Sequence, residues 1–282
     1  MKPNFLGIGA VRGGSTWLHE VLKSHPDFYL PSKRKEVQYF TRFYDKGPKF
    51  YESFFPEHQI LKSGCKWYGE ITPGYLREPQ APRRIAELGT IKKIVMTVRN
   101  PIDRAYSHYK WHIQLHNESI TFMQFYSNRQ GKLRSLAIEN GLYAKFLKQY
   151  LQHFHREQFL IIPFEEIVER PSAIYSQLKD FFNLEEDFIS VRKKNQSVIP
   201  KYKKTARYAH LLTQKMRKYN LDFIPNAVIR YGGKNLLGKG ESKKNNYRIT
   251  LEDRENLTSI FYEDVQELKE LFSLKLDWKD FR

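Results

Sequence analysis

A glycine-containing segment near the start of the chain has the residue types of a phosphate-binding loop. An apolar run leads into Ala10-Val11-Arg12-Gly13-Gly14-Ser15-Thr16-Trp17. Glycines let backbone N–H groups turn toward a ligand, and the N-terminus of a following helix adds partial positive charge. Gly9 and Gly14 have the spacing of the G-x-x-x-x-G-K-[ST] pattern, but Ser15 stands at its lysine position. Arg12 is the candidate for the missing cation, and the alternative is an ordinary tight turn with Ser15 as helix cap.

A second set of anion-binding residue types follows another apolar run. Arg99 comes directly after Ile94–Val98, and Ser107 lies two turns into a helix that we expect to begin at Pro101. Because ligands of parallel sheets bind at the carboxyl ends of the strands, Arg99 and Ser107 are candidates to hold a second phosphate. Two anion sites on one sheet edge suit a nucleotide that is phosphorylated at two positions. The alternative is a structural arginine that binds a carboxylate of its own protein.

These residues need a sheet that brings several strand ends to one edge, and the hydrophobic pattern predicts one. Short apolar runs alternate with amphipathic segments along the chain, which favours an α/β fold with a mostly parallel central sheet flanked by helices, in a single domain over residues 1–282. The expected strands are Phe5–Gly9, Lys66–Ile71, Ile94–Val98 and Phe159–Ile162. The expected helices are Ser15–Ser24, Pro82–Leu88, Pro101–His112, Leu142–His155, Ser172–Phe182 and Leu251–Phe272.

Composition narrows the class of protein. The 48 lysines and arginines against 31 aspartates and glutamates give a formal net charge of +17, and 40% of the residues are hydrophobic. Such a chain attracts anions and has enough apolar residues for a packed core, which excludes a disordered protein. It shows no nucleic-acid-binding signature. We interpret single basic runs, such as Lys33-Arg34-Lys35, as solvated faces.

The lone cysteine and the absence of long apolar runs bear on location. Cys65 excludes an internal disulfide and makes a Cys/His zinc site improbable. No apolar run reaches the roughly 18–20 residues of a membrane span, and the N-terminal run does not have the pattern of a signal peptide. We therefore expect a cytoplasmic protein without a membrane span.

The two anion motifs together resemble those of sulfotransferases that use 3′-phosphoadenosine 5′-phosphosulfate (PAPS). Residues 12–17 resemble their 5′-phosphosulfate loop, and residues 98–107 resemble their 3′-phosphate motif. The likeness is greatest to the branch of heparan sulfate N-deacetylase/N-sulfotransferases and 3-O-sulfotransferases. It extends in the same order through Lys35–Phe40, Tyr44–Gly47, Tyr51–Pro56, Glu70–Tyr75, Ala81–Arg84, Gly141–Ala144 and Leu237–Gly240.

This resemblance implies a P-loop-like sulfotransferase fold and transfer of a sulfuryl group from PAPS to a hydroxyl or amine, with a carbohydrate as the expected acceptor and 3′-phosphoadenosine 5′-phosphate (PAP) as product. No metal is expected. Glu36 is the implied general base, because the acceptor must lose a proton. Arg12 is the implied catalytic cation and also binds the cofactor. The other implied cofactor-binding residues are Gly13, Gly14, Ser15, Thr16, Trp17, Arg99, Ser107, Phe164, Ser197, Lys239, Lys243 and Lys244.

Several alternatives stay open at this point. Glu36 is alternatively a partner for the cations before it, and His19, His108 and His112 are other candidates for the base. The related branch usually has lysine where Arg12 stands and often has lysine where Ile71 stands. Its luminal members also carry paired cysteines and a membrane anchor, so this chain is closer to a bacterial-type or cytosolic relative.

Three other functions compete with glycan sulfation. The first is sulfation of a small metabolite in a bacterial pathway. The second is a P-loop nucleotide kinase, which the missing lysine disfavours. The third is a polyanion-binding protein without catalysis, which needs the basic runs but not Glu36. The oligomeric state is not indicated.

Overall fold

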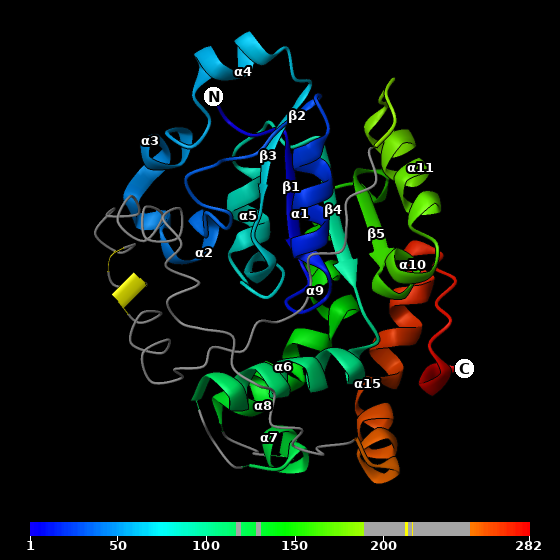
Figure 1. Ribbon diagram of the computed structural model, residues 1–282. Helices are drawn as coiled ribbons and strands as arrows, with labels where there is room; N and C mark the ends of the chain where they lie inside the picture. The colour runs from blue at the N-terminus through cyan, green and yellow to red at the C-terminus, as the bar shows by residue number, and fades with distance from the viewer. Residues whose placement is uncertain (117–119, 128–130, 189–211, 214–215, 217–248) are drawn as a thin grey trace.

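A parallel sheet forms the centre of the structure (Figure 1). The structure is a computed structural model of the chain and describes residues 1–116, 120–127, 131–188, 212–213, 216 and 249–282. Within these residues the strand order is β2-β3-β1-β4-β5, and every pair is parallel. The bounds are β1 Phe5–Gly9, β2 Phe28–Tyr29, β3 Trp67–Ile71, β4 Lys93–Val98 and β5 Phe159–Pro163. The predicted α/β class with a mostly parallel sheet is confirmed.

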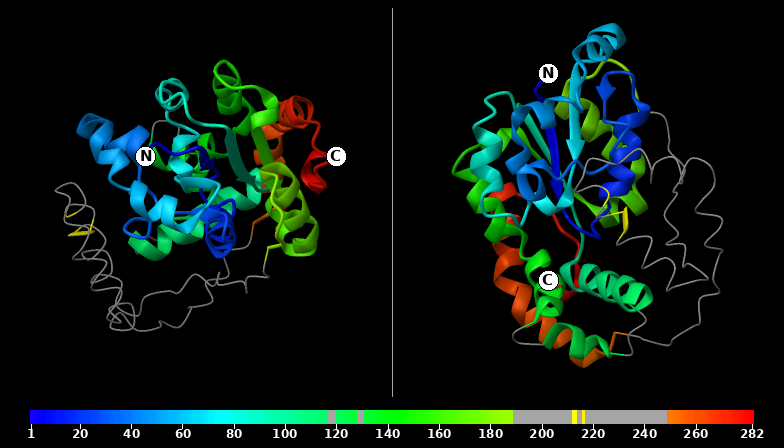
Figure 2. Two further views of the ribbon diagram at one scale, coloured as in Figure 1. Left: turned by 90° about the horizontal axis from the view of Figure 1, so that it is seen from above. Right: turned by 90° about the vertical axis from the view of Figure 1, so that its left-hand side faces the viewer.

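Helices cover both faces of this sheet (Figures 1 and 2). On one face, α1 (Ser15–Ser24), α10 (Phe164–Glu169) and α11 (Pro171–Phe182) pack through one apolar cluster. On the other, α5 (Ala81–Ala86), α9 (Tyr143–Leu151) and α15 (Leu251–Phe272) pack through a second. The remaining helices are α2 Tyr39–Arg42, α3 Gly47–Glu52, α4 Glu57–Ser63, α6 Pro101–His116, α7 Phe122–Ser127 and α8 Lys132–Ala137.

The central strands are apolar on both faces because both are buried. Along β4, Ile94, Met96 and Val98 belong to the cluster with α5 and α9, whereas Val95 belongs to the cluster with α1. Side chains of a strand alternate between faces, so a sheet with helices on both sides needs continuous apolar runs. These are the runs by which the sequence predicts the strands.

Short connecting helices are what the sequence analysis missed. The strands and helices it predicted are all present, with ends that shift by a few residues, and Leu251–Phe272 is present as predicted. The structure adds β2 and the short helices α2, α3, α4, α7, α8 and α10. These elements have two to seven residues, too few for a hydrophobic period to repeat, and contacts with neighbouring elements stabilise them.

A buried aspartate shows how tertiary contacts complete a helix. The N-terminus of α9 has no side-chain cap of its own. Asp264 of α15 accepts hydrogen bonds from the Ala144 and Lys145 amides at 3.1 and 2.9 Å. It thereby satisfies two of the amides that a helix start leaves unpaired. This contact joins α9 to α15 on the face of the sheet away from α1.

Candidate functional site

The loop between β1 and α1 approaches the ends of β4 and β5 because it contains two glycines. A Cβ atom on Gly13 would lie 2.9 Å from the Thr97 carbonyl oxygen of β4. Gly14 has φ +111°, and a Cβ there would lie 2.9 Å from Cδ2 of Phe164. Both positions therefore require glycine. Arg12, the residue directly before Gly13, also has a left-handed backbone conformation, with φ 66°.

The start of α1 leaves backbone donors for an anion. Gly14 occupies the N-cap position of α1 and has no side chain that could cap the helix. The Trp17 and Leu18 amides both donate to the Gly14 carbonyl, at 2.9 and 3.2 Å. Among the described residues, the amides of Ser15 and Thr16 are thus the first-turn donors that remain, and helix N-termini bind anions through such groups.

The two anion motifs meet at Arg12. Its Nε and Nη2 atoms donate to Oγ of Ser107 on α6, at 3.3 and 3.2 Å. The order of the strands explains the contact, because β1 and β4 are neighbours and α6 begins where β4 ends. Strand order also reverses at β1, the place where such sheets bind ligands. The sequence predicted two separate sites, whereas the structure joins them through one guanidinium group.

Arg99 is held in place by its backbone. Its carbonyl oxygen accepts from the Tyr143 hydroxyl at 2.8 Å, and the next amide, of Asn100, donates to Glu165 at 3.1 Å. The Arg99 guanidinium carbon lies 4.9 Å from the ring centre of Phe164. Phe164 therefore lies close to both Arg99 and the loop at Gly14.

The cations of this edge are not neutralised within the described part of the chain. Arg12, Arg99 and Arg104 form no ion pair with a carboxylate there. Burial, and then the charge of Arg99, lowers the pKa of Arg12. Burial lowers the pKa of Arg104 to about 10, and two of its buried nitrogens, Nε and Nη1, have no partner among the described residues. Crowded, desolvated cations are costly, and a bound anion removes that cost.

Lys35 is a site residue that the sequence analysis missed. Its Nζ donates to Oγ1 of Thr16 at 2.7 Å, which places an ammonium group at the first turn of α1. Burial lowers its pKa, against the opposing charges of Glu36 and Glu20. The interpretation of this run as a solvated face was wrong for Arg34 and Lys35, whereas Lys33 is exposed. Arg34 is 2% exposed and lies over an aromatic group of Phe43, Phe50 and Phe54.

Comparison with known proteins identifies the family. The family model described as the sulfotransferase domain matches residues 2–269. The chain belongs to the sulfotransferase family. The expected family and fold are thereby confirmed, and this match argues against the alternative of a P-loop nucleotide kinase.

Relatives of this sulfotransferase include heparan sulfate enzymes. It is 32% identical over 189 residues to human heparan sulfate glucosamine 3-O-sulfotransferase 3B1, a match of 64% of this chain and 46% of that protein. It is 29% identical over 197 residues to a bifunctional heparan sulfate N-deacetylase/N-sulfotransferase 1 of Caenorhabditis elegans, covering 65% of this chain and 22% of that protein. The match therefore spans less than half the length of these relatives.

A solved bacterial structure has a similar fold. A sulfotransferase from Alicyclobacillus acidocaldarius superposes with a TM-score of 0.66 at 23% identity, covering 98% of both chains. The likeness supports the fold of this sulfotransferase, and at that identity it carries no statement about the substrate.

Glu36 of this sulfotransferase is half-buried, and the backbone after it is tied to β3 and the turn that follows. The Val37 amide donates to Oε2 of Glu70 at 3.4 Å, and the Gln38 amide donates to Oγ1 of Thr72 at 3.2 Å. The Tyr39 amide donates to the Tyr75 hydroxyl at 2.9 Å. Three successive amides after Glu36 are therefore hydrogen-bonded to side chains of residues 70–75.

The histidines proposed as alternative bases are less suitable. Burial, and then the neighbouring arginine charges, lowers the pKa of His108 to about 3, which makes it a weak base. Burial and the Lys35 charge lower the pKa of His19. His112 is buried and packs against His116, with ring centres 4.4 Å apart.

Other predicted site positions have different surroundings. Trp17 is 5% exposed and stacks on Tyr175 of α11, with ring centres 6.0 Å apart. Its contact with adenine stays a prediction, and Tyr175 already covers one face of the ring. Ile71 is fully buried and packs against Gly7, so this position contributes to the core rather than supplying a cation. Ser197, Lys239, Lys243 and Lys244 lie outside the described residues.

The described residues contain neither a cluster of metal-ligating side chains nor a membrane-spanning helix. No three His, Cys, Asp or Glu side chains come together there in a way that would hold a metal ion. In that same part of the chain, no helix has the length and apolar character needed to cross a membrane. The predictions of no metal and of a cytoplasmic location stay predictions.

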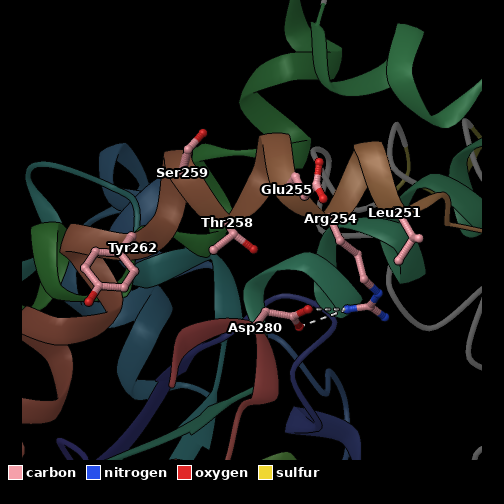
Figure 3. A pocket seen from close by; sticks show the side chains of 7 residues that line it. All are labelled: Leu251, Arg254, Glu255, Thr258, Ser259, Tyr262 and Asp280. Atoms are coloured by element: carbon pink, nitrogen blue, oxygen red, sulfur yellow. Dashed lines mark hydrogen bonds and ion pairs between the residues drawn. The ribbon is translucent and has the colours of Figure 1, made fainter.

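A separate surface pocket of about 450 Å³ lies along α15 (Figure 3). Figure 3 shows Arg254 directed toward Asp280, and the two side chains form an ion pair at 2.9 Å. Arg254 also pairs with Asp103 at 3.0 Å. The cation of this pocket is thus neutralised, in contrast to those at the loop after β1.

The buried carboxyl group of Glu70 predicts a pH dependence of stability. Burial raises its pKa to about 7, above the ordinary 4.5, although bonds from Thr72, Tyr75 and the Val37 amide act the other way. The charge of Glu36 adds to the rise, and the Tyr51 and Tyr75 hydroxyls face the same group. Between the two pKa values the folded protein keeps a proton that the unfolded chain has lost. The contribution of Glu70 to the free energy of unfolding therefore falls as pH rises through this window.

Urea unfolding of the wild type and Glu70→Gln at pH 5, 6, 7 and 8 measures this effect. The wild type should lose stability relative to the variant as pH rises from 5 to 7, by on the order of 1.4 kcal/mol per pH unit at most. The difference should level off above pH 7. Two parallel stability curves would contradict a raised pKa.

Proposed function

We propose that this chain transfers a sulfuryl group from PAPS to a hydroxyl or amine of a carbohydrate. The observation that carries the proposal is the meeting of the two anion motifs, where Arg12 contacts Ser107 beside unneutralised arginines. Membership of the sulfotransferase family supports the reaction class. A P-loop kinase would need the lysine that Ser15 replaces.

The described residues suit a nucleotide with two anionic groups. The amides of Ser15 and Thr16 and the Arg12 guanidinium group are the donors for the 5′-phosphosulfate. Arg99 and Ser107 are the donors for the 3′-phosphate. Phe164, which lies between Gly14 and Arg99, offers a ring for the adenine. The unpartnered Arg104 nitrogens add positive potential behind these groups.

In this mechanism the protein supplies positioning, charge and a base. PAPS supplies an already electrophilic sulfur, so a new bond from the acceptor oxygen or nitrogen to sulfur forms while the bond from sulfur to the 5′-phosphate oxygen breaks. The Glu36 carboxylate accepts the proton that the acceptor loses. Arg12, Lys35 and the helix amides stabilise the negative charge that grows on the departing phosphate oxygen.

Two observations support a carbohydrate as the acceptor. The curated relatives include heparan sulfate enzymes, and a net charge of +17 suits an acidic polysaccharide. A cytoplasmic location and a single domain over residues 1–282 belong to the same proposal.

Radiolabelled PAPS tests the acceptor class directly. The protein is incubated with heparosan, N-sulfated heparosan, heparan sulfate and chondroitin, and in parallel with small alcohols, phenols and amines. We expect label in a polysaccharide. Label only in small molecules would replace the carbohydrate with a metabolite, and binding of polysaccharide without any transfer would favour the noncatalytic alternative.

Arg99 should account for selectivity toward the 3′-phosphate. Isothermal titration should show that PAP binds the wild type much more tightly than ADP. Arg99→Ala should lower PAP affinity by roughly 10- to 100-fold, since a charged hydrogen bond contributes about 1.5–3 kcal/mol, and should leave ADP affinity nearly unchanged. Arg83→Ala, on the exposed part of α5, is the matched control. Equal affinity of the wild type for PAP and ADP would refute the 3′-phosphate assignment.

Glu36 should be required for turnover but not for cofactor binding. Glu36→Gln keeps the size of the side chain but cannot accept a proton, so the rate of transfer should fall by about 10²–10⁴-fold. PAP affinity and the melting temperature should stay close to the wild-type values. Turnover at the wild-type rate would remove Glu36 from the base role, whereas loss of PAP binding would indicate a purely structural role in the loop.

A further inference from the structure

We propose that Glu70 is a positioning residue for sulfuryl transfer, whose buried carboxylate holds the backbone that carries Glu36. The inference rests on the proposed role of Glu36 as base. Glu70 does not reach the loop after β1 in any described contact. It acts through the hydrogen bonds that tie residues 37–39 to β3 and the turn after it.

The carboxylate accepts three hydrogen bonds in a fully buried position. Glu70 is 0% exposed and is bonded by the Thr72 hydroxyl at 2.6 Å and the Tyr75 hydroxyl at 2.5 Å, one on each carboxylate oxygen. The third bond comes from the Val37 amide at 3.4 Å. No lysine or arginine forms an ion pair with it among the described residues.

Glu70 also determines the direction of the two hydroxyl groups. A hydroxyl has one proton, and both Thr72 and Tyr75 donate theirs to the carboxylate. Their lone pairs are then free to accept the amides of Gln38 and Tyr39. Because a carboxylate accepts hydrogen bonds on both oxygens, both hydroxyls can donate to Glu70 while they accept the two amides. A glutamine places an NH₂ group against one hydroxyl, which must then turn its own proton away from residue 70 and accept from the NH₂ group as well as from the backbone amide, so the orientation that the carboxylate enforces is lost.

The backbone at this point needs such support. Gln38 has φ 58°, a left-handed conformation that is uncommon for a residue with a side chain. On the other side of Glu36, Lys35 is fixed by its bond to Thr16 at the start of α1. Glu36 is therefore held between a contact to the cofactor loop and a contact to Glu70. A small shift of either end changes the distance between the base and the acceptor.

The energetics favour positioning over stability as the role of Glu70. Burying a carboxylate without a cation costs free energy, and the pKa of Glu70, raised to about 7 by burial, reflects that cost. A group that stabilised the fold alone would do so better as an apolar residue. The hydroxyl directions that Glu70 enforces supply a reason for an acidic residue here.

Four variants test the inference at pH 8, above the pKa of about 7 to which burial raises Glu70, so that the group is a carboxylate. The donor is PAPS, and the acceptor comes from the panel or is water if no acceptor is found. Glu70→Gln should lower kcat by roughly 10- to 100-fold, since small displacements of catalytic groups have effects of this size. Its KM for PAPS and its Kd for PAP should stay within about threefold of the wild type, because the loop after β1 is untouched. Thr72→Val removes the acceptor for the Gln38 amide and should also lower kcat. Thr72→Ser keeps the hydroxyl and should restore most of it.

Asp253→Asn is the matched control, because Asp253 is another buried carboxylate that accepts a tyrosine hydroxyl and a backbone amide, from Tyr126 and Thr250, but at the start of α15. It should lower the melting temperature and leave kcat unchanged.

The outcomes separate this inference from the proposed function. Wild-type kcat in Glu70→Gln, while Glu36→Gln is slow, overturns the inference and leaves the base assignment standing. Wild-type turnover in Glu36→Gln overturns the base and, with it, the inference. If Glu70→Gln loses PAP affinity as strongly as it loses kcat, or if Thr72→Ser is as slow as Thr72→Val, Glu70 has only a structural role.

Discussion

Positive charge without a partner carboxylate is the constraint on which this structure depends. Arg12, Arg99 and Arg104 gather at the carboxyl ends of β1 and β4, and within the described residues none forms an ion pair. Apolar packing on both faces of the sheet offsets the free-energy cost of this crowded charge. The Tyr143 hydroxyl fixes the backbone of Arg99. In the proposed function, such a site needs no reorganisation when the anionic cofactor reacts, which is the condition for electrostatic catalysis.

The acidic groups of the site are kept apart from these cations. Glu36 and Glu70 come from the β3 side of β1, whereas Arg99 and Ser107 come from the β4 side. One contact between the two halves is the bond from Lys35 to Thr16. In the proposed function, this separation keeps the Glu36 carboxylate available as a base next to the positively charged residues that would bind the cofactor. Direct pairing of Glu36 with Arg12 would neutralise both groups and remove the function of each.

The sequence was sufficient for elements whose pattern is local. Runs such as Phe5–Gly9 and Ile94–Val98 are almost entirely apolar, with Thr97 the one polar residue, because both faces of the sheet are covered. Helix α15 has a long amphipathic repeat. Sequence reasoning failed for short helices such as α2 and α10, which have no full repeat of their own. It also misjudged Lys33-Arg34-Lys35, since nothing local distinguishes a solvated basic run from one packed on aromatic rings.

By itself the sequence determined the family, the glycine loop and the cation types, because these depend on residue identity at fixed spacing along one segment. The tertiary structure alone decided which groups meet. Arg12 and Ser107 are 95 residues apart, and Glu70 lies 33 residues from the Val37 amide that it accepts. Such contacts depend on strand order and on the direction of a few hydroxyl protons. A local sequence pattern encodes neither of them. Both depend on which distant segments form hydrogen bonds with each other in the buried core.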